Sequence, residues 1–344
     1  MSHFNDNRIR IIEFNVENLF IRLDHYDGRD LDSFTEREWQ KLSASTVPNK
    51  PLASLKALAA AILDMNPDIA MLVEVGGTES LSHFNQLFLG GKYEGHLLEG
   101  NSNRGIDLGY LVKKSLPYRY DLNSYRDRSL DFLYPHERQS KESGYGHLRS
   151  ARFESHKFSR DVLELRVYEE LAADESDPAF ILLLVHLKSP LDRNRIDPGG
   201  RDRRRAELEK LIQIYQEIQF QFPQASVLLA GDFNGAAGLP QPDVEFEALY
   251  RLTTLRDCLE VAGVAIDERF TYQQIYRDRI PQNRQIDFIF IPESIFSRVN
   301  PQETWSYRFK DQNQRTILIP RTFNEKKQLP SDHFPVVLTL NPKV

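Results

Sequence analysis

The chain of 344 residues is poor in cysteine and has no long hydrophobic run. Cys258 is its one cysteine, so neither an intrachain disulfide nor a thiolate zinc cluster can form. The longest hydrophobic run, residues 179–185, is too short to cross a bilayer. The first eight residues lack the cationic and apolar regions of a signal peptide. We therefore expect a cytoplasmic protein without membrane insertion.

The composition is that of a folded globular protein. Hydrophobic residues make up 40% and charged residues 27% of the chain, which excludes collagen-like, low-complexity and wholly disordered classes. Length alone favours about two domains. However, the sequence contains no internal repeat and no linker-like tract, so we expect a single domain over residues 1–344.

The charges are unevenly distributed. The formal net charge of −6 is not typical of a nucleic-acid binder, yet residues 113–160 carry eleven basic against six acidic residues. Residues 193–210 carry seven basic against four acidic residues. Such segments suit an anionic ligand, although solvated loops of mixed charge explain either segment equally well. Because residues 113–160 show few periodic apolar positions, we expect a loop insertion there that selects the substrate.

Hydrophobic patterning predicts an α/β protein. Strands are expected at residues 8–15, 68–74, 107–112, 161–168, 179–187, 226–230, 285–291 and 334–340. Helices are expected at residues 51–65, 81–89 and 201–222, with a helical piece near 243–250. Some strands are neighbours along the chain and others are separated by helices. This pattern favours a sandwich with mixed sheets over a doubly wound dinucleotide-binding fold.

Polar residues recur at the ends of the expected strands. They are Asn15, Glu17, Glu74, His186, Asp232, Asn234, Asp287, Asp332 and His333. Strand ends at one edge of a sheet are where α/β folds assemble sites. Carboxylates converging there would repel one another unless a cation lies between them. Oxygen donors without cysteine suit Mg²⁺ or Mn²⁺, and histidines beside the metal suit proton transfer and stabilisation of phosphorane charge.

Each of these residues also has a purely structural interpretation. Asp232 and Asn234 could form an Asx turn after a strand, and Glu74 could be a solvated edge residue. Asp332 could be a turn residue, and His333 a hydrogen-bonded core histidine. The functional interpretation depends on finding all of them, in one order, at strand ends.

That order resembles the endonuclease/exonuclease/phosphatase superfamily, which includes DNase I-like nucleases. The matching runs are EFNVENLF at 13–20, LVEV at 72–75, LVHLKS at 184–189, GDFN at 231–234, QIDF at 285–288 and SDHFPV at 331–336. The match runs from about residue 8 to 341, nearly the whole chain. The resemblance implies a four-layer α/β/β/α sandwich with two mixed β-sheets, and Mg²⁺-dependent hydrolysis of phosphate esters.

The resemblance also implies a role for each matched position. Glu74 is expected to ligate the metal, with Asn15 beside it and Asp332 at a second metal position. Asp232 and Asn234 are expected to orient the attacking water or the phosphate. His333, paired with Asp287, is expected to act as general base or as a charged phosphate clamp. His186 is expected to hydrogen-bond a phosphate oxygen or to protonate the leaving group.

The branch of the superfamily determines the substrate. His186 favours the DNase I and sphingomyelinase side, and the missing Trp-Cys-Asp-Arg-type motif argues against inositol 5-phosphatases. We therefore expect a nuclease-like phosphodiesterase acting on DNA or RNA. The alternatives are a phosphatase or phosphodiesterase for small molecules or lipid headgroups, and a non-catalytic scaffold. Arg104, Tyr110 and Arg160 are weak candidates for phosphate contacts, since packing or a surface turn explains them as well.

Overall fold

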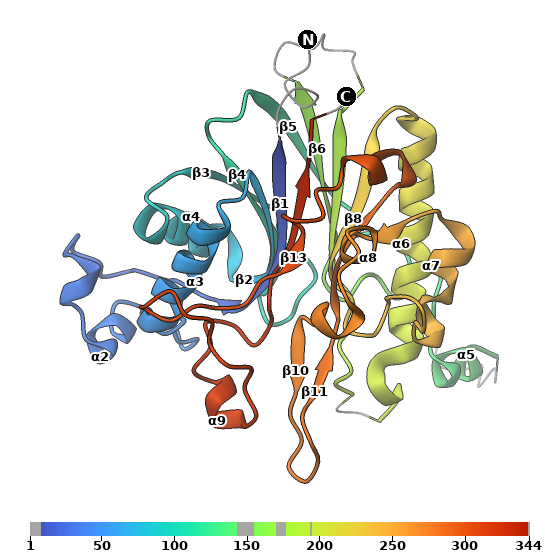
Figure 1. Ribbon diagram of the computed structural model, residues 1–344. Coiled ribbons are helices and arrows are strands. Elements are labelled where there is room, and N and C mark those ends of the chain that lie inside the picture. The colour runs from blue at the N-terminus through green and yellow to red at the C-terminus, as the bar shows by residue number, and fades with distance from the viewer. Residues whose placement is uncertain (1–7, 143–154, 170–176, 193–194, 343–344) are drawn as a thin grey trace.

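A computed structural model of the chain describes residues 8–142, 155–169, 177–192 and 195–342 (Figure 1). Residues 1–7, on which the expectation about a signal peptide rests, lie outside these ranges, as do residues 143–154 of the expected insertion. Within the described ranges, no helix combines the length and hydrophobicity that a bilayer span requires.

Two six-stranded sheets form the centre of the molecule. The first contains, in order, β13 (Trp305–Ser306), β14 (Val336–Leu340), β1 (Ile9–Leu19), β2 (Ile69–Val75), β4 (Asp107–Lys113) and β3 (Tyr93–Leu97). The second contains β5 (Tyr118–Ser124), β6 (Val162–Glu169), β7 (Phe180–His186), β8 (Ser226–Asp232), β12 (Asp287–Ile291) and β9 (Arg256–Asp257). Within each sheet one central pair is parallel, β1 with β2 and β7 with β8, and the other pairs are antiparallel. Both sheets are therefore mixed, as predicted.

Helices lie on the outer faces of the sheets (Figure 1). The first sheet is covered by α3 (Leu52–Met65) and α4 (Gly77–Phe88), and the second by α6 (Arg201–Gln221) and α7 (Glu247–Leu252). The short helices are α2 (Glu36–Gln40), α5 (Pro135–Glu142), α8 (Cys258–Val261) and α9 (Phe323–Lys326). The 3₁₀ turns are η1 (Leu31–Ser33), η2 (Pro198–Gly200), η3 (Val244–Phe246), η4 (Ile266–Glu268) and η5 (Glu293–Arg298). A separate two-stranded hairpin of β10 (Tyr272–Gln274) and β11 (Gln282–Arg284) projects from the lower edge in Figure 1.

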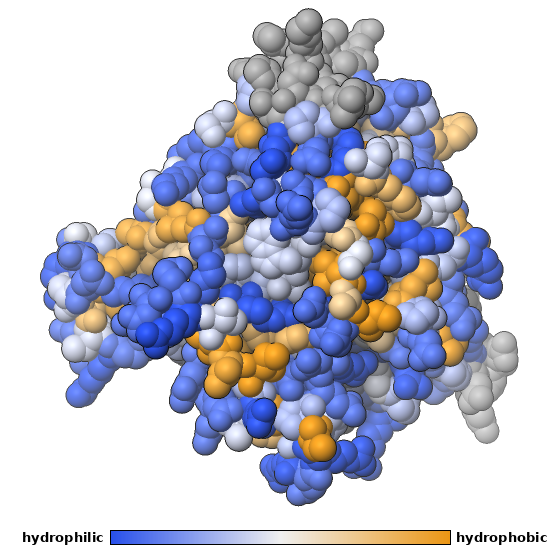
Figure 2. All heavy atoms as spheres, in the orientation of Figure 1, coloured by the Kyte–Doolittle hydropathy of each residue, from blue (hydrophilic) through white to orange (hydrophobic). Residues whose placement is uncertain are grey.

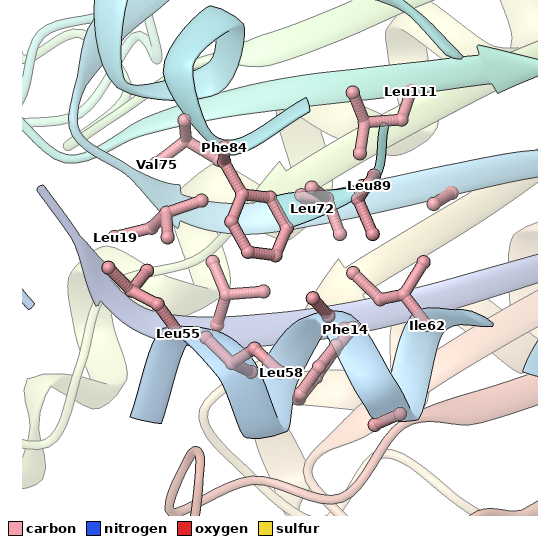
Figure 3. Packing of buried hydrophobic residues seen from close by; sticks show 14 of the residues in the cluster. Phe14, Leu19, Leu55, Leu58, Ile62, Leu72, Val75, Phe84, Leu89 and Leu111 are labelled. Atoms are coloured by element: carbon pink, nitrogen blue, oxygen red, sulfur yellow. The ribbon is translucent and has the colours of Figure 1, made fainter. Parts of the chain in front are cut away.

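Strand alternation explains the layers, because successive side chains of a strand point to opposite faces. On β1, Ile9 and Ile11 pack between the two sheets, whereas Ile12 and Phe14 face the helices. Leu55, Leu58 and Ile62 of α3 recur at helical spacing and pack against Phe14 and Leu72 (Figure 3). Each such fully buried leucine contributes about 1.5–3 kcal/mol. These buried faces produce the predicted α/β/β/α sandwich.

Hydrophobic residues on the face seen in Figure 2 gather in separate patches on a mostly hydrophilic surface.

The predicted loop insertion at 113–160 is wrong over residues 118–124, because this segment is the edge strand β5 of the second sheet. Tyr118, Tyr120 and Leu122 alternate with polar residues and pack against the core between the sheets. The charged residues between them hide this alternation in the sequence. Part of the remaining segment forms α5.

Candidate functional site

The carboxyl ends of the two parallel pairs, β1 with β2 and β7 with β8, and the amino ends of the antiparallel strands β12 and β14 bring the predicted polar residues to one edge of the sandwich. His186 is the last residue of β7 and lies in register with Asp232, the last residue of β8. Asp287, the first residue of β12, lies opposite Asp232 on the other side. Asn15 comes from β1 of the facing sheet. Pairing register therefore places three of the predicted residues side by side.

The backbone at this edge adopts conformations that most residues avoid. Of the eight non-glycine residues with positive φ in the described part of the chain, four lie here, namely Glu17, Asn18, Glu74 and Asn234. The β1–β2 register shifts after Asn15, and the β2–β4 register shifts around Glu74, so bulges direct these side chains. Gly231 has φ 137°, and a Cβ there would lie 1.9 Å from the carbonyl oxygen of Val185. A glycine is therefore required immediately before Asp232.

His333 and Asp287 form a buried hydrogen-bonded pair. His333 Nδ1 lies 2.9 Å and 3.0 Å from the two carboxylate oxygens of Asp287, and both side chains are almost fully buried. Burial alone would lower the pKa of His333, but the charges of Asp287 and Asp332 outweigh burial and hold that pKa well above its usual value. The imidazole is therefore protonated at neutral pH. The ring of Tyr272 packs against it, with centroids 5.1 Å apart.

Asp232 is the central carboxylate of the site. It accepts hydrogen bonds from Asn15 Nδ2 at 3.1 Å and from the Asn234 backbone N–H at 2.8 Å. Burial, followed by the negative charge of Asp287, raises the pKa of Asp232 to about 7. The Asx turn that Asn234 closes is thus present, and it fixes the Asp232 carboxylate within the cluster.

His186 lies on the other side of Asp232, with Nε2 3.6 Å from an Asp232 carboxylate oxygen. Its Nδ1 is buried without a hydrogen-bond partner among the described residues. Burial lowers the pKa of His186 well below its usual value, and the positive charges of Arg160, His333 and Arg104 add to this effect. The ring is therefore neutral, a hydrogen-bonding group and not a charged acid.

Glu17, Glu74 and Asp332 are partly exposed beside the buried cluster, and we call this acidic edge the entrance. Arg104 and Arg160 lie near it. Glu74 accepts a hydrogen bond from the Asn18 backbone N–H at 3.0 Å, and Arg104 donates to the Asn18 side chain at 2.5 Å. Arg160 is 9% exposed, and burial lowers its pKa against the opposing charges of Glu207, Glu74 and Asp232. Both arginines therefore lie within electrostatic reach of the site.

Tyr110, the third weak candidate, does not line the site. Its side chain is fully buried between the sheets, and its hydroxyl lies 2.8 Å from the Leu163 carbonyl oxygen and 2.9 Å from that of Leu182. The predicted phosphate contact of Tyr110 is wrong, and the packing interpretation is correct.

Two lysines that the sequence did not single out contact acidic residues of the site. Lys326 Nζ lies 3.4 Å from an Asp332 carboxylate oxygen. Lys50, itself buried, donates to the Glu17 carbonyl oxygen at 2.7 Å and lies 3.8 Å from its carboxylate. Lys50 precedes α3 and Lys326 ends a four-residue helix, so neither stands near a strand end that would have marked it.

Glu13 is a third residue that sequence reasoning missed. It is fully buried, and neither carboxylate oxygen has a hydrogen-bond partner among the described residues. Burial raises its pKa well above its usual value, and the negative charges of Asp287 and Asp232 raise it further. Glu13 lies two residues before Asn15 on β1, so strand alternation puts both on the face toward the second sheet. The two-residue spacing between Glu13 and Asn15 is the sequence signal that could have identified Glu13.

Two sets of donors could hold a cation. Asp232, Asp287 and His333 offer atoms within 4.8 Å of one another, but all three are buried. His333 Nδ1 is already bonded to Asp287, which leaves this nitrogen no free lone pair for a metal. Glu74, in contrast, makes no ion pair within the described part of the chain and lies at the entrance. The oxygen donors of Glu74 and Asn15 therefore fit a hard divalent cation better.

A cleft of about 1340 Å³ opens on the other side of β10. Gln273, Trp305, Ile317 and Leu329 are among its lining residues, and none of the residues predicted for the site is. Because Tyr272 packs on His333 and side chains alternate along β10, Gln273 points away from the site into this cleft.

No family model and no curated protein sequence matches the chain. Solved structures do. TDP2 from D. rerio, complexed with a single-strand DNA product, has a TM-score of 0.55 and 16% identity over 98% of this chain and 100% of its own. The human Nocturnin catalytic domain with bound sulfate has a TM-score of 0.55 and 16% identity over 96% and 93%.

An endonuclease/exonuclease/phosphatase family protein from Bacteroides thetaiotaomicron has a TM-score of 0.52 and 14% identity over 97% of this chain and 98% of its own. At such identities the likeness establishes the fold. The two mixed sheets, their helix layers and these structural neighbours together confirm the fold that the resemblance implied. The chain therefore has the DNase I-like fold of the endonuclease/exonuclease/phosphatase superfamily.

Proposed function

We propose that this chain is a divalent-metal-dependent phosphodiesterase that acts on nucleic acid. The observation that carries the proposal is the joining of the Asp287–His333 pair to Asp232 at the edge where Glu74 and Arg160 also lie. An imidazolium, a buried carboxylate, a carboxylate without an ion pair and a guanidinium are the groups that hydrolysis of a phosphodiester needs. A non-catalytic scaffold would not require this combination of charged groups.

Glu74, with Asn15 beside it, would hold a Mg²⁺ or Mn²⁺ ion. Such an ion supplies charge that stabilises the phosphate oxygens during substitution. The side-chain amide nitrogen of Asn15 donates its hydrogen bond to Asp232, so the side-chain oxygen Oδ1 is the atom left for a cation. That oxygen also accepts the Glu17 backbone N–H at 3.0 Å, which fixes its direction.

The protein groups can complete the hydrolysis. Asp232, held by Asn15 and Asn234, orients the attacking water and takes its proton as the new P–O bond forms. The bond from phosphorus to the leaving oxygen breaks, and the leaving oxygen takes a proton from the His333 imidazolium. Exchange of one proton with water at each group restores the starting state. The raised pKa of His333 supports a charged imidazole over a general base, and the proton donation proposed here replaces the phosphate clamp that the resemblance implied.

His186 and the arginines would bind the phosphate. A neutral His186 can donate a hydrogen bond to a phosphate oxygen, whereas Arg104 and Arg160 supply positive charge. The nearby β10–β11 hairpin carries Arg277 and Arg279, both exposed and without an ion pair to any other described residue. These charges favour a polyanionic strand over a single small phosphate ester.

The test is hydrolysis by the purified chain with Mg²⁺ or Mn²⁺, and with EDTA as the metal-free control. Substrates are single-stranded, duplex and abasic DNA, RNA, bis-p-nitrophenyl phosphate, inositol phosphates and sphingomyelin. His333→Ala is the inactive variant. His83→Ala is the matched control, because His83 lies on α4 and bonds the Ile21 carbonyl oxygen away from the site.

Metal-dependent cleavage of a nucleic acid that His333→Ala abolishes and His83→Ala retains would support the proposal. Selective turnover of sphingomyelin or an inositol phosphate would replace nucleic acid with a headgroup substrate. Cleavage that EDTA does not affect would contradict the metal requirement.

A further inference from the structure

Lys326 is held in place by three contacts at the acidic entrance of the site. Its Nζ lies 3.4 Å from an Asp332 carboxylate oxygen, donates to the Gln273 carbonyl oxygen at 3.0 Å, and lies 3.4 Å from the centroid of the Tyr272 ring. A carboxylate, a carbonyl oxygen and the face of an aromatic ring are all groups that attract a cation. The side chain is 11% exposed, so the contacts are shielded from water.

The helix that carries Lys326 is fixed at its start. Thr322 accepts the Glu325 backbone N–H, and the Glu325 carboxylate accepts the Thr322 backbone N–H, which forms a capping box on α9. The ammonium group is therefore a fixed part of the site and does not belong to a freely moving surface chain.

The acidic residues at the entrance differ in how they are neutralised. Asp332 lies 3.4 Å from Lys326 Nζ through one carboxylate oxygen and 3.7 Å from His333 Nε2 through the other, and Glu17 lies next to the buried Lys50. Glu74 has no ion-pair partner in the described ranges. A divalent ion bound to Asp332 would lie within a few ångströms of the Lys326 ammonium, and charges of one sign at that separation repel by several times the thermal energy.

We propose that Lys326 is the resident cation of Asp332, so that the site binds one divalent ion, at Glu74, and excludes a second. This inference rests on the proposed function for the identity of the first ion, but it concerns how many ions the site holds. It replaces the sequence-based expectation that Asp332 lies at a second metal position.

The test counts bound Mn²⁺, by electron paramagnetic resonance of the free ion during titration at neutral pH. Lys326→Met removes the ammonium and keeps a chain of similar length. Lys326→Arg retains the charge. Lys327→Met is the matched control, because Lys327 is exposed beside the same helix. Glu74→Gln removes the carboxylate expected to hold the single ion.

We expect one ion per chain for the wild type, Lys327→Met and Lys326→Arg, two for Lys326→Met, and a loss of the ion for Glu74→Gln. Two ions in the wild type would overturn the proposal, as would a count that stays at one in a folded Lys326→Met. If Lys326→Met fails to fold, Asp332→Asn decides: it must keep the one ion, and a lost ion would show that Asp332 is a ligand.

Counting ions does not require turnover, so the two proposals fail differently. One bound ion without hydrolysis of any substrate would remove the proposed function and leave this inference standing. Two bound ions with metal-dependent hydrolysis of a nucleic acid would support the proposed function and overturn this inference.

Discussion

The side-chain amide of Asn15 donates a hydrogen bond of 3.1 Å to the carboxylate of Asp232, and this bond joins one sheet to the other. Ser331 adds a second link, on the side of the first sheet. Its hydroxyl donates to the backbone carbonyl oxygen of Asn15 at 2.7 Å and accepts a hydrogen bond from the His333 backbone N–H at 3.1 Å. Asn15 thus connects Asp232 with the turn that carries His333.

Asn15→Ala should lower both stability and turnover. It leaves the buried Asp232 carboxylate with one hydrogen bond fewer, a loss of about 1–3 kcal/mol in the free energy of unfolding. Urea denaturation measures this loss, and kcat on the best substrate measures the effect on turnover. Asn313→Ala, at an exposed position, is the control and should change neither quantity. Wild-type turnover in Asn15→Ala would contradict the positioning role of this amide.

Asp287→Asn should shift the pH dependence of kcat/KM toward acid. The Asp287 charge raises the pKa of His333 and also raises the pKa of Asp232, which is about 7. Without that charge the imidazolium loses its proton at lower pH and Asp232 ionises at lower pH, so both limbs of the profile move in the same direction. A profile from pH 5 to 10 for wild type and variant checks this. If the limbs do not move, these two groups do not control the rate.

Glu13→Gln should stabilise the protein increasingly as pH rises. The folded-state pKa of Glu13 is raised, so its contribution to stability is fully present below the unfolded-state pKa and is lost as pH rises through the folded-state pKa. Glutamine does not titrate and keeps that stability. The difference in unfolding free energy can grow by up to about 1.4 kcal/mol per pH unit across this window. Urea titrations from pH 4 to 9 measure it, and a pH-independent difference would show that the pKa of Glu13 is the same in the folded and unfolded states.

Arg160→Gln should raise KM for a nucleic-acid strand by roughly 10-fold or more, since a lost charge-assisted hydrogen bond costs about 1.5–3 kcal/mol. Arg160→Lys should recover part of the affinity because it retains the charge. Arg251→Gln, an exposed change on α7, is the control. An unchanged KM in a folded Arg160→Gln would remove this residue from the phosphate-binding groups.

The sequence predicted the site residues wherever a strand end marked them. Asp232 and Asp287 end and begin apolar strands, and pairing register then places them opposite each other. The distance between such residues could not be predicted, since it depends on how β8 and β12 align. The bulge at Glu74 could not be predicted either, because the residue with positive φ is a glutamate and not a glycine.

Residues outside the strands were beyond sequence reasoning. Lys50 and Lys326 lie 276 positions apart and meet the same acidic entrance only after both sheets have formed. The edge strand β5 was missed for a related reason, because its charged positions alternate with tyrosines that are only partly buried. For the lysines the deciding contact is tertiary and leaves no local pattern, whereas β5 does show the alternation of a strand, which its charged residues made hard to distinguish from a loop.

The place of β14 in the first sheet has a consequence for synthesis of the chain. β14 pairs with β1, so the last strand of the described residues is an inner neighbour of the first. Until residues 336–340 have left the ribosome, the backbone groups on the β14 side of β1 have no strand to pair with. His333 arrives on the same segment. The Asp287–His333 pair therefore cannot form before that segment is made, and the candidate site and the completed first sheet arise together.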